Sequence, residues 1–277
     1  MEKNIGIIVD SSCDITEEEA KAMGITVMPL PIFINGKEYY GKMSYEELVE
    51  HLRNDERVTT SQISLGLLLD VFERASREYE EVVYIPISSG LSGMCNTVSS
   101  ICAQFDNIYV IDSRTISLPT ITLCKEIQRL WSQGKKAKEI KSIMEANELV
   151  GIIIPDDIRF LKTGGRLAPA ALAIANVLKI VPVLIYKDGK IDLYEKVKTK
   201  KKAFDKGLDM LTDVKDPADY YWGVEYATVD MKKVEELTEK VKKLTKQNVE
   251  LCELGHVIVS HTGPDTLVVS RLKKFDV

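Results

Sequence analysis

Apolar runs alternate with amphipathic stretches through the first half of the chain. The apolar runs cover residues 5–9, 82–87, 108–111 and 151–154. The amphipathic stretches cover residues 44–53 and 65–78, and residues 94–105 are compatible with a further helix. A short, continuous apolar run is typical of a strand that is buried on both faces of a parallel sheet. The alternation with helical periodicity therefore predicts a parallel sheet with helices on both faces.

Local signals predict where several elements begin and end. Thr16, which is followed by three glutamates, predicts the start of a short helix, and Gly24 predicts its end. Residues 26–34 are extended, and Asn35-Gly36 predicts a tight turn into residues 38–40.

The second half has a different pattern. Asp188-Gly189 predicts a hairpin between residues 181–186 and 190–195. Further helices are expected at 197–211 and 231–246, and further strands at 221–228, 248–253 and 256–261. Hairpins mixed with helices predict an α+β domain with a mixed sheet. The sequence thus predicts two domains, an N-terminal three-layer domain at 1–150 and a C-terminal α+β domain at 151–277.

Composition and charge narrow the classes of function. The chain has 277 residues, of which 45% are hydrophobic and 29% charged, with a net charge of −5. This balance argues against a nucleic-acid partner and against electrostatic docking on an anionic membrane. No apolar run is long enough for a membrane span, and five cysteines without CxxC spacing predict reduced thiols and a cytoplasmic location. Only three histidines are present, which leaves few ligands for a metal site.

Hydroxyl and carboxylate side chains follow the predicted strands repeatedly. They occur at Asp10-Ser11-Ser12, at 88–93 and at Asp112-Ser113, while Thr59-Thr60-Ser61-Gln62 precedes a helix. Ligands of open α/β sheets bind beyond the carboxyl ends of the strands. These clusters therefore favour a shared polar pocket, and helix capping is the alternative interpretation.

The segment Ser88-Ser89-Gly90-Leu91-Ser92-Gly93 is the most informative of these clusters. Its glycines let the backbone approach a ligand, and the helix that follows offers unpaired N–H groups with partial positive charge. The spacing matches neither a Walker loop nor a dinucleotide fingerprint, and the loop has no lysine. The segment predicts an anion site that suits a carboxylate better than a triphosphate, and a turn that caps a helix is the alternative.

Covalent catalysis by Ser92 ranks below ligand binding. The residues around Ser92 do not form a Gly-x-Ser-x-Gly elbow, because Met94 stands where the second glycine belongs. His261 with Asp10 or Asp112 would have to complete a triad in space, which the sequence does not show.

Two further segments carry candidate chemistry. Arg166 follows Gly164-Gly165 and suits a carboxylate or phosphate, with an interdomain salt bridge as the alternative. The helix expected at 168–178 is almost wholly apolar, which predicts burial. Its small alanines suit close packing or, alternatively, room for a long apolar ligand. His261 is expected at a strand end, as a structural donor or as the partner of a carboxylate.

In chain order, these motifs resemble the DegV family of bacterial fatty-acid-binding proteins. The matching pieces span nearly the whole chain: Ile8-Val9-Asp10-Ser11, Val27-Met28-Pro29-Leu30, Thr59-Thr60-Ser61-Gln62, Ser88-Ser89-Gly90-Leu91-Ser92-Gly93, Ile111-Asp112-Ser113, Phe160-Leu161-Lys162-Thr163-Gly164-Gly165-Arg166 and His261-Thr262-Gly263-Pro264. The resemblance implies a DegV-like fold of two α/β domains with a long-chain fatty acid buried between them.

The resemblance also implies roles for individual residues. Thr60, Ser61 and Ser92 would hold the carboxylate together with the Gly93 backbone, and His261 would lie close by. In some bacteria such proteins present the acid to a separate fatty acid kinase. The chain departs from the usual pattern at Met94, at Leu118-Pro119, at Lys198 where an arginine is common, and at Asp265 where glycine is common.

Three hypotheses follow. The leading one is a non-catalytic carrier of fatty acid that needs no cofactor or metal. The second is a phosphotransferase subunit related to dihydroxyacetone kinases, in which His261 would hold the substrate. The third is a regulatory interaction protein without a ligand.

Overall fold

Four parallel strands form the sheet of the N-terminal half, in the order β2-β1-β6-β7. The computed structural model describes residues 4–39, 43–173 and 180–275. The strands are β1 (Gly6–Asp10), β2 (Ile25–Met28), β6 (Val82–Ile85) and β7 (Ile108–Val110). Every residue of β1 and β6 is buried. The parallel sheet predicted from the continuous apolar runs is therefore confirmed.

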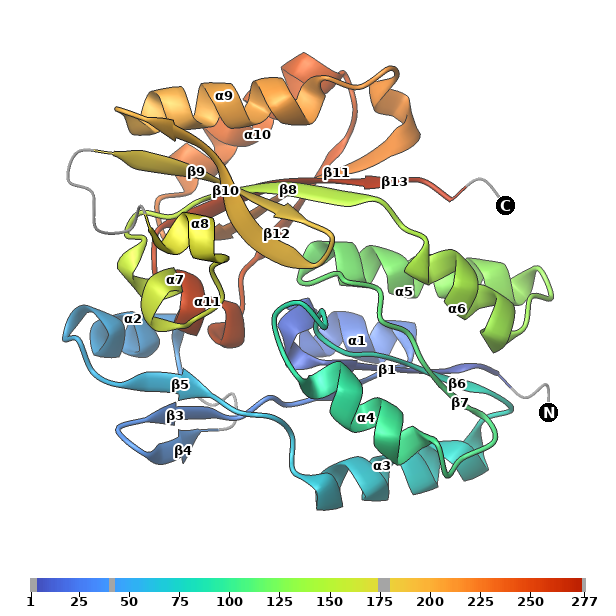
Figure 1. Cartoon of the computed structure of the whole chain (residues 1–277). Coiled ribbons are helices and arrows are strands. Elements are labelled where there is room, and N and C mark those ends of the chain that lie inside the picture. The colour runs from blue at the N-terminus through green and yellow to red at the C-terminus, as the bar shows by residue number, and fades with distance from the viewer. Residues whose placement is uncertain (1–3, 40–42, 174–179, 276–277) are drawn as a thin grey trace.

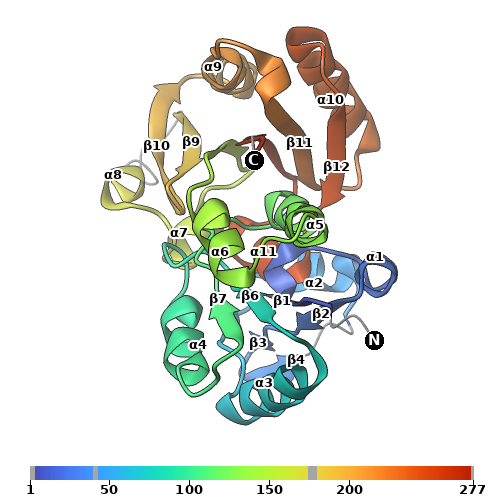
Figure 2. The same ribbon diagram turned by 90° about the vertical axis from the view of Figure 1, so that its right-hand side faces the viewer.

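Helices cover both faces of this sheet (Figures 1 and 2). Ile7 and Val9 of β1 pack with α1 (Glu17–Met23), α5 (Leu118–Ser132) and α6 (Ala137–Glu145) on one face. Ile8 packs with α3 (Leu65–Glu78) and α4 (Met94–Cys102) on the other. Successive side chains of a strand point to opposite faces, so one apolar run supplies both cores.

A smaller antiparallel sheet, in the order β4-β3-β5, stands beside the parallel sheet (Figure 1). Its strands are β3 (Ile32–Ile34), β4 (Lys37–Tyr39) and β5 (Val58–Thr60), and α2 (Tyr45–Arg53) connects β4 to β5. The predicted Asn35-Gly36 turn is confirmed, with φ of 49° and 83°. Residue 40, the end of the expected strand at 38–40, lies outside the described residues.

The predicted helix starts in this half are also confirmed. Thr16 and Ser44 each accept a hydrogen bond from the backbone N–H three residues on, and Glu19 and Glu47 return the contact. This reciprocal capping box satisfies two N–H groups that a helix leaves without partners. Gly24 ends α1 with φ of 65°.

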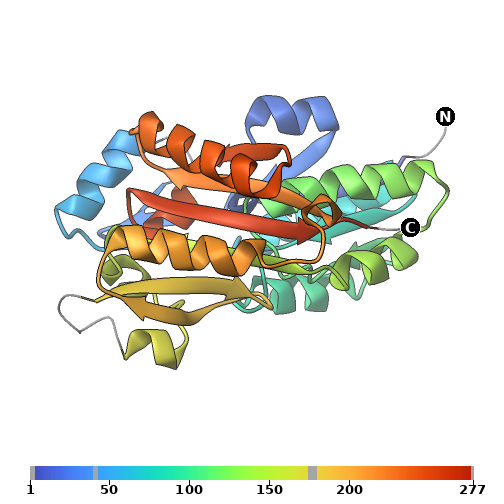
Figure 3. The ribbon, with the colours of Figure 1, turned by 90° about the horizontal axis from the view of Figure 1, so that it is seen from above.

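The second sheet has six strands in the order β10-β9-β8-β13-β11-β12. They are β8 (Leu149–Ile154), β9 (Val181–Lys187), β10 (Lys190–Val197), β11 (Tyr220–Ala227), β12 (Val249–Glu253) and β13 (Thr266–Lys273). Only the pairing of β11 with β12 is parallel among these described strands, so the predicted mixed sheet is confirmed. The outer face is covered by α9 (Lys200–Thr212) and α10 (Met231–Thr245), as Figure 3 shows from above.

The two halves share a helical layer. In Figure 1, α5 and α6 lie between the two sheets. Leu123 and Ile127 of α5 belong to the same apolar cluster as Ile153, Leu184 and Leu272 of the second sheet. The core is therefore continuous from one half to the other. The predicted domain limits at 1–150 and 151–277 remain predictions.

Several predictions about the second half are wrong in detail. Residues 256–261 are not a strand but belong to a helix, α11 (His256–Thr262), which Gly255 precedes as N-cap. Three consecutive apolar residues fit a buried helix as well as a strand, so the pattern alone did not separate the two. The run at 151–154 belongs to β8, which pairs antiparallel with β9 and β13 rather than extending the parallel sheet.

The segment after Arg166 also differs from the expected long helix. α7 (Arg159–Thr163) precedes Gly164-Gly165, and α8 (Pro169–Leu172) follows as a single turn. Ala171 is buried, but Ala173 is exposed. Residues 174–179, where the apolar helix was expected to continue, lie outside the described residues. The five cysteines are free and buried, as expected of small core residues.

Candidate functional site

All six residues singled out as binding candidates line one pocket of about 480 Å³. The pocket lies beyond the carboxyl end of β6, where the sheet topology favours ligand sites. The six residues come from the end of β5, the loop between β6 and α4, the loop after α7, and α11: they are Thr60, Ser61, Ser92, Gly93, Arg166 and His261. Segments far apart in the sequence therefore meet at one cavity.

The loop between β6 and α4 presents a hydroxyl and a helix N-terminus to the pocket. The backbone N–H groups of Leu91 and Ser92 donate to the Ser88 carbonyl at 3.0 and 3.1 Å, which closes a tight turn. Ser92 Oγ accepts from the Met94 backbone N–H at 3.2 Å. The Ser92 hydroxyl therefore keeps its own hydrogen for a ligand, beside the partial positive charge of the first turn of α4.

Thr60 and His261 form the polar contact across the pocket. Thr60 Oγ1 lies 2.7 Å from His261 Nε2. Burial, and secondarily the positive charge of Arg166, lowers the pKa of His261 to about 4. The ring is therefore neutral at physiological pH, and its Nδ1 atom is buried without a hydrogen-bond partner among the described residues. Nδ1 faces Gly164, where a Cβ atom would lie only 2.6 Å away.

The contacts of the triad considered for Ser92 are not formed among the described residues. A catalytic histidine needs a third group that orients its ring and stabilises its positive charge. Neither acid considered takes that place: Asp10 accepts hydrogen bonds from Ser12 and from the Ile87 backbone, and Asp112 accepts from the Ser89 backbone. The hydrogen-bond partner of His261 is Thr60, not Ser92.

Arg166 adds the positive charge of the pocket. Its guanidinium donates to the carbonyls of Leu91, at 3.4 Å, and Gly164. Among the described residues it forms no ion pair, so the salt bridge considered as its alternative role is not present there. Burial lowers the pKa of Arg166, yet an arginine remains charged at neutral pH.

An apolar annex, defined here as the cavity of about 60 Å³ beside the main pocket, extends the site. Both cavities share Leu91, Ile116, Ile191, Ile258 and Thr262. Beyond them, the annex is lined mostly by apolar side chains of the second sheet, among them Leu149, Ile153 and Val268. The pocket with the hydroxyl groups thus borders an apolar cavity that the second sheet helps to line.

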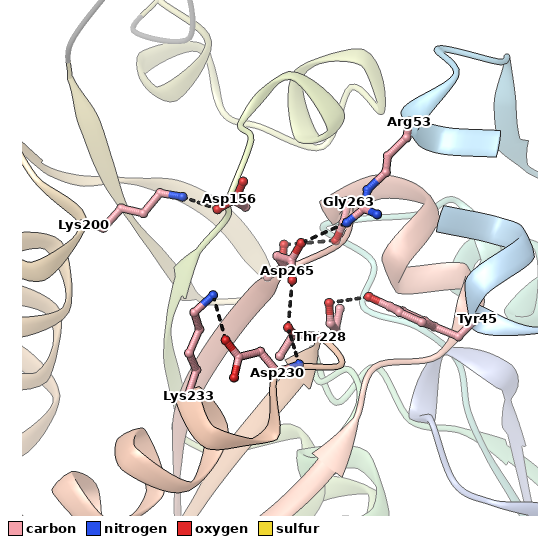
Figure 4. A network of polar contacts seen from close by, with 11 residues as sticks. Tyr45, Arg53, Asp156, Lys200, Thr228, Asp230, Lys233, Gly263 and Asp265 are labelled. Carbon is pink, nitrogen blue, oxygen red and sulfur yellow. Dashed lines mark hydrogen bonds and ion pairs between the residues drawn. The ribbon is translucent and has the colours of Figure 1, made fainter. Parts of the chain in front are cut away.

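A network of polar contacts holds the segment that follows His261 (Figure 4). Asp265 accepts a hydrogen bond from Thr228 Oγ1 at 2.8 Å and pairs with Arg53 of α2 at 3.4 Å. The Tyr45 hydroxyl, also on α2, donates to the Ala227 carbonyl. These contacts tie α2 to the loops that flank α11 and β11, which fixes the helix that carries His261.

Several lining residues were not expected from the sequence. Val257 and Ile258 contribute the apolar wall because α11 is a helix. Gln62 lines the pocket as well, with Oε1 accepting from Thr97 Oγ1 at 2.8 Å. Gln62 belongs to a polar cluster that the sequence singles out, although it was not named as a binding residue. The apolar wall could have been predicted only if residues 256–262 had been interpreted as a helix.

Comparisons with known proteins agree with this architecture. A family model described as an uncharacterised protein of the DegV family matches residues 4–274. The chain belongs to the DegV family. A DegV domain-containing protein of Staphylococcus aureus is 29% identical over 279 residues, covering 97% of this chain and 98% of the relative. The resemblance seen in the sequence motifs is therefore confirmed.

Solved structures of similar proteins have the same fold. A fatty acid binding DegV family protein of Streptococcus agalactiae superposes with a TM-score of 0.86 at 26% identity, covering 98% of this chain and 99% of the other. A stearic acid-binding protein of Eubacterium ventriosum superposes with a TM-score of 0.88 at 24% identity, with 99% of each chain covered.

The described residues contain neither a candidate metal site nor a helix suited to span a membrane. No group of three or more His, Cys, Asp or Glu side chains there is arranged to hold a metal ion. No helix in the same part of the chain is long and apolar enough to cross a membrane.

Proposed function

We propose that this DegV-family protein binds one long-chain fatty acid, with the carboxylate at the Thr60–Ser92 end of the main pocket and the acyl chain along the apolar wall of this pocket and into the apolar annex. The observation that carries the proposal is that two cavities, one with hydroxyl groups and the other apolar, lie side by side and share five lining residues. Ligand pockets are typically apolar, with a few placed polar groups that fix orientation. The DegV proteins of Streptococcus agalactiae and Bacillus subtilis are both fatty acid binding proteins, which supports the choice of ligand.

The neutral His261 ring sets the direction of the hydrogen bonds. We infer that Nε2–H donates to Thr60 Oγ1, so that the Thr60 hydroxyl hydrogen is free to donate to the carboxylate. Ser92 Oγ–H and the Gly93 backbone N–H are the further donors proposed, and the exposed Ser61 hydroxyl lies at the pocket rim. Arg166 supplies attraction at longer range.

The acyl chain supplies most of the affinity. Burial of the methylene groups of a sixteen-carbon acid at about 0.8 kcal/mol each gives roughly 10 kcal/mol before the costs of ordering. Such a ligand survives purification. The proposal requires no cofactor and no metal.

We propose further that the protein is a carrier without catalysis of its own, and that a separate fatty acid kinase acts on the bound acid. His261 has a low pKa and no orienting acid among the described residues, which suits a hydrogen-bond donor rather than a general base. Ser61 and Gly93 are exposed, so a partner enzyme has access to the carboxylate end. Acyl phosphate formed from ATP only when both proteins are present would support this step.

The test of the binding proposal is extraction of the purified protein and identification of the ligand by mass spectrometry. The expected result is one fatty acid per chain, and rebinding that is weakened in Ser92→Ala. A small ketone or a phosphorylated sugar would favour the phosphotransferase hypothesis instead. No stoichiometric ligand, together with no rebinding of added fatty acid, would refute the carrier proposal.

A further inference from the structure

A buried carboxyl group lines the apolar annex. Glu225 of β11 is only 2% exposed, and its side chain is among those that surround the annex. Glu225 Oε1 accepts a hydrogen bond from Ser270 Oγ at 2.7 Å. Glu225 Oε2 is buried and has no hydrogen-bond partner among the described residues. A buried polar atom of this kind calls for an explanation, because nearly all such atoms are paired in folded proteins.

The described part of the chain does not supply the missing partner. No lysine or arginine pairs with Glu225 within the described part of the chain, and its titratable neighbours Asp14 and Cys252 carry no positive charge. Burial raises the pKa of Glu225 to about 7. Near neutral pH much of this carboxyl is therefore protonated, and it both donates and accepts hydrogen bonds.

The position of Glu225 relates it to the ligand rather than to the sheet alone. Ser270 and Ser117 line the annex beside it, whereas the rest of the lining consists largely of aliphatic side chains. A saturated acyl chain in the annex would offer Glu225 no hydrogen-bond partner. A hydroxyl group on the chain would donate to that oxygen, or accept from it when the carboxyl is protonated.

We propose that the annex accepts fatty acids with an oxygen substituent, such as a hydroxyl group, on the part of the chain remote from the carboxylate, and that Glu225 and Ser270 recognise this substituent. The inference rests on the proposed function and deepens it, since it names a class of fatty acid for the same pocket. Recognition is by hydrogen bonding alone, and no covalent step is involved.

The experiment compares stearic acid with a series of stearic acids that carry one hydroxyl at successive carbons of the distal half. Dissociation constants are measured by calorimetry for the parent, Glu225→Gln and Glu225→Leu. In the parent, at least one hydroxyl position should bind as tightly as stearic acid or more tightly. In Glu225→Leu the affinity for that same acid should fall about tenfold or more relative to the affinity for stearic acid, because the hydroxyl of the acid is then buried without a partner.

Glu225→Gln is the matched control, since the amide keeps the shape and the hydrogen-bonding capacity of the side chain. It should retain the preference for the hydroxylated acid. Ser270→Ala provides a second test that leaves the carboxyl in place, and it should weaken the same preference. Thermal melts of all variants establish that each is folded before binding is compared.

The outcomes separate the two proposals. If neither stearic acid nor any hydroxylated acid binds the parent, the proposed function fails. If stearic acid binds but every distal hydroxyl weakens binding equally in the parent and in Glu225→Leu, the fatty acid site stands and the recognition by Glu225 is refuted.

Discussion

Replacement of Thr60 by valine tests the proposed carboxylate site most directly. Valine has nearly the shape of threonine and suits the strand β5, in which Thr60 pairs with Ile32. The change removes one hydroxyl group, which lies 2.7 Å from His261 Nε2 and is proposed to donate to the carboxylate. Any loss of affinity would therefore report a hydrogen bond rather than a change of pocket shape.

The expected loss follows from the kind of bond that is removed. A hydrogen bond to a charged group contributes about 1.5–3 kcal/mol, so binding should weaken by roughly ten- to a hundredfold. The same change leaves His261 Nε2 without a partner, which should lower the free energy of unfolding by about 1 kcal/mol or more. Both effects come from one contact and should appear together.

Displacement of a fluorescent fatty acid measures the affinity, and urea unfolding measures the stability. Thr59→Val is the matched control: Thr59 is the preceding residue of the same strand, is exposed and does not line the pocket. It should leave the affinity unchanged. If Thr60→Val binds fatty acid as tightly as Thr59→Val, the inferred donation from Thr60 to the carboxylate is wrong.

Three further changes give separate tests. Gly164→Ala should weaken binding severalfold in the displacement assay, because the added Cβ would lie 2.6 Å from His261 Nδ1 and push the ring away from Thr60. Gly66→Ala is the control: its added Cβ meets no neighbouring atom, so binding should not change. The pKa of Glu225 is raised from 4.5 to about 7, so the folded protein keeps a proton that the unfolded chain loses, and stability falls as the pH rises through this range. Relative to the parent, Glu225→Gln should therefore gain up to roughly 3 kcal/mol in unfolding free energy between a pH below 4.5 and one above 7. Urea titrations at a series of pH values measure this gain. If the difference in unfolding free energy between variant and parent does not change with pH, the pKa of about 7 for Glu225 is wrong. Asp265→Ala should lower the free energy of unfolding by about 1–2 kcal/mol in the same titrations, because it removes the contacts to Thr228 and Arg53 and places alanine at a φ of 56°. Asp265→Gly loses the same contacts but adopts that φ freely, so it should cost less.

Elements with a long, strong pattern were predictable from the sequence. The helix expected at 65–78 corresponds to α3 (Leu65–Glu78), whose Leu68 and Phe72 are buried on one face. The two turns at Asn35-Gly36 and Asp188-Gly189 were equally clear, because a tight hairpin turn requires the left-handed backbone that these residues adopt readily. In these places local chemistry decides the structure.

Elements whose form depends on distant partners were not predictable. The short strand β5 pairs with β3, more than twenty residues earlier. Its three residues are β-branched, but a segment of three is too short to predict a strand without its partner. β13 was not expected at all, although it lies between β8 and β11 within the second sheet. Its run of Leu267, Val268 and Val269 is apolar, but a run of three does not separate strand from helix.

The same limit applies to the candidate site. The hydroxyl residues could be singled out because polar side chains after apolar runs stand out in a sequence. That Thr60 would contact His261, 201 residues later, depends on the packing of α11 against the small sheet and α7. Likewise Glu225 gave no signal, because a single glutamate in a strand is normally exposed, and only the fold shows that it is buried.

The shared core bears on how a ligand enters the pocket. Leu123 and Ile127 of α5 pack in one cluster with Ile153 and Leu184 of the second sheet, so a hinge that separated the two halves would expose this apolar surface to water. At the pocket, by contrast, the loop that carries Arg166 is held to the loop between β6 and α4 by a hydrogen bond from Arg166 to the Leu91 carbonyl. One hydrogen bond contributes about 0.5–1.5 kcal/mol net, so this loop moves at a lower cost than the core opens. We therefore expect the proposed acyl chain to enter by local movement of this loop, while the core between the two sheets stays closed.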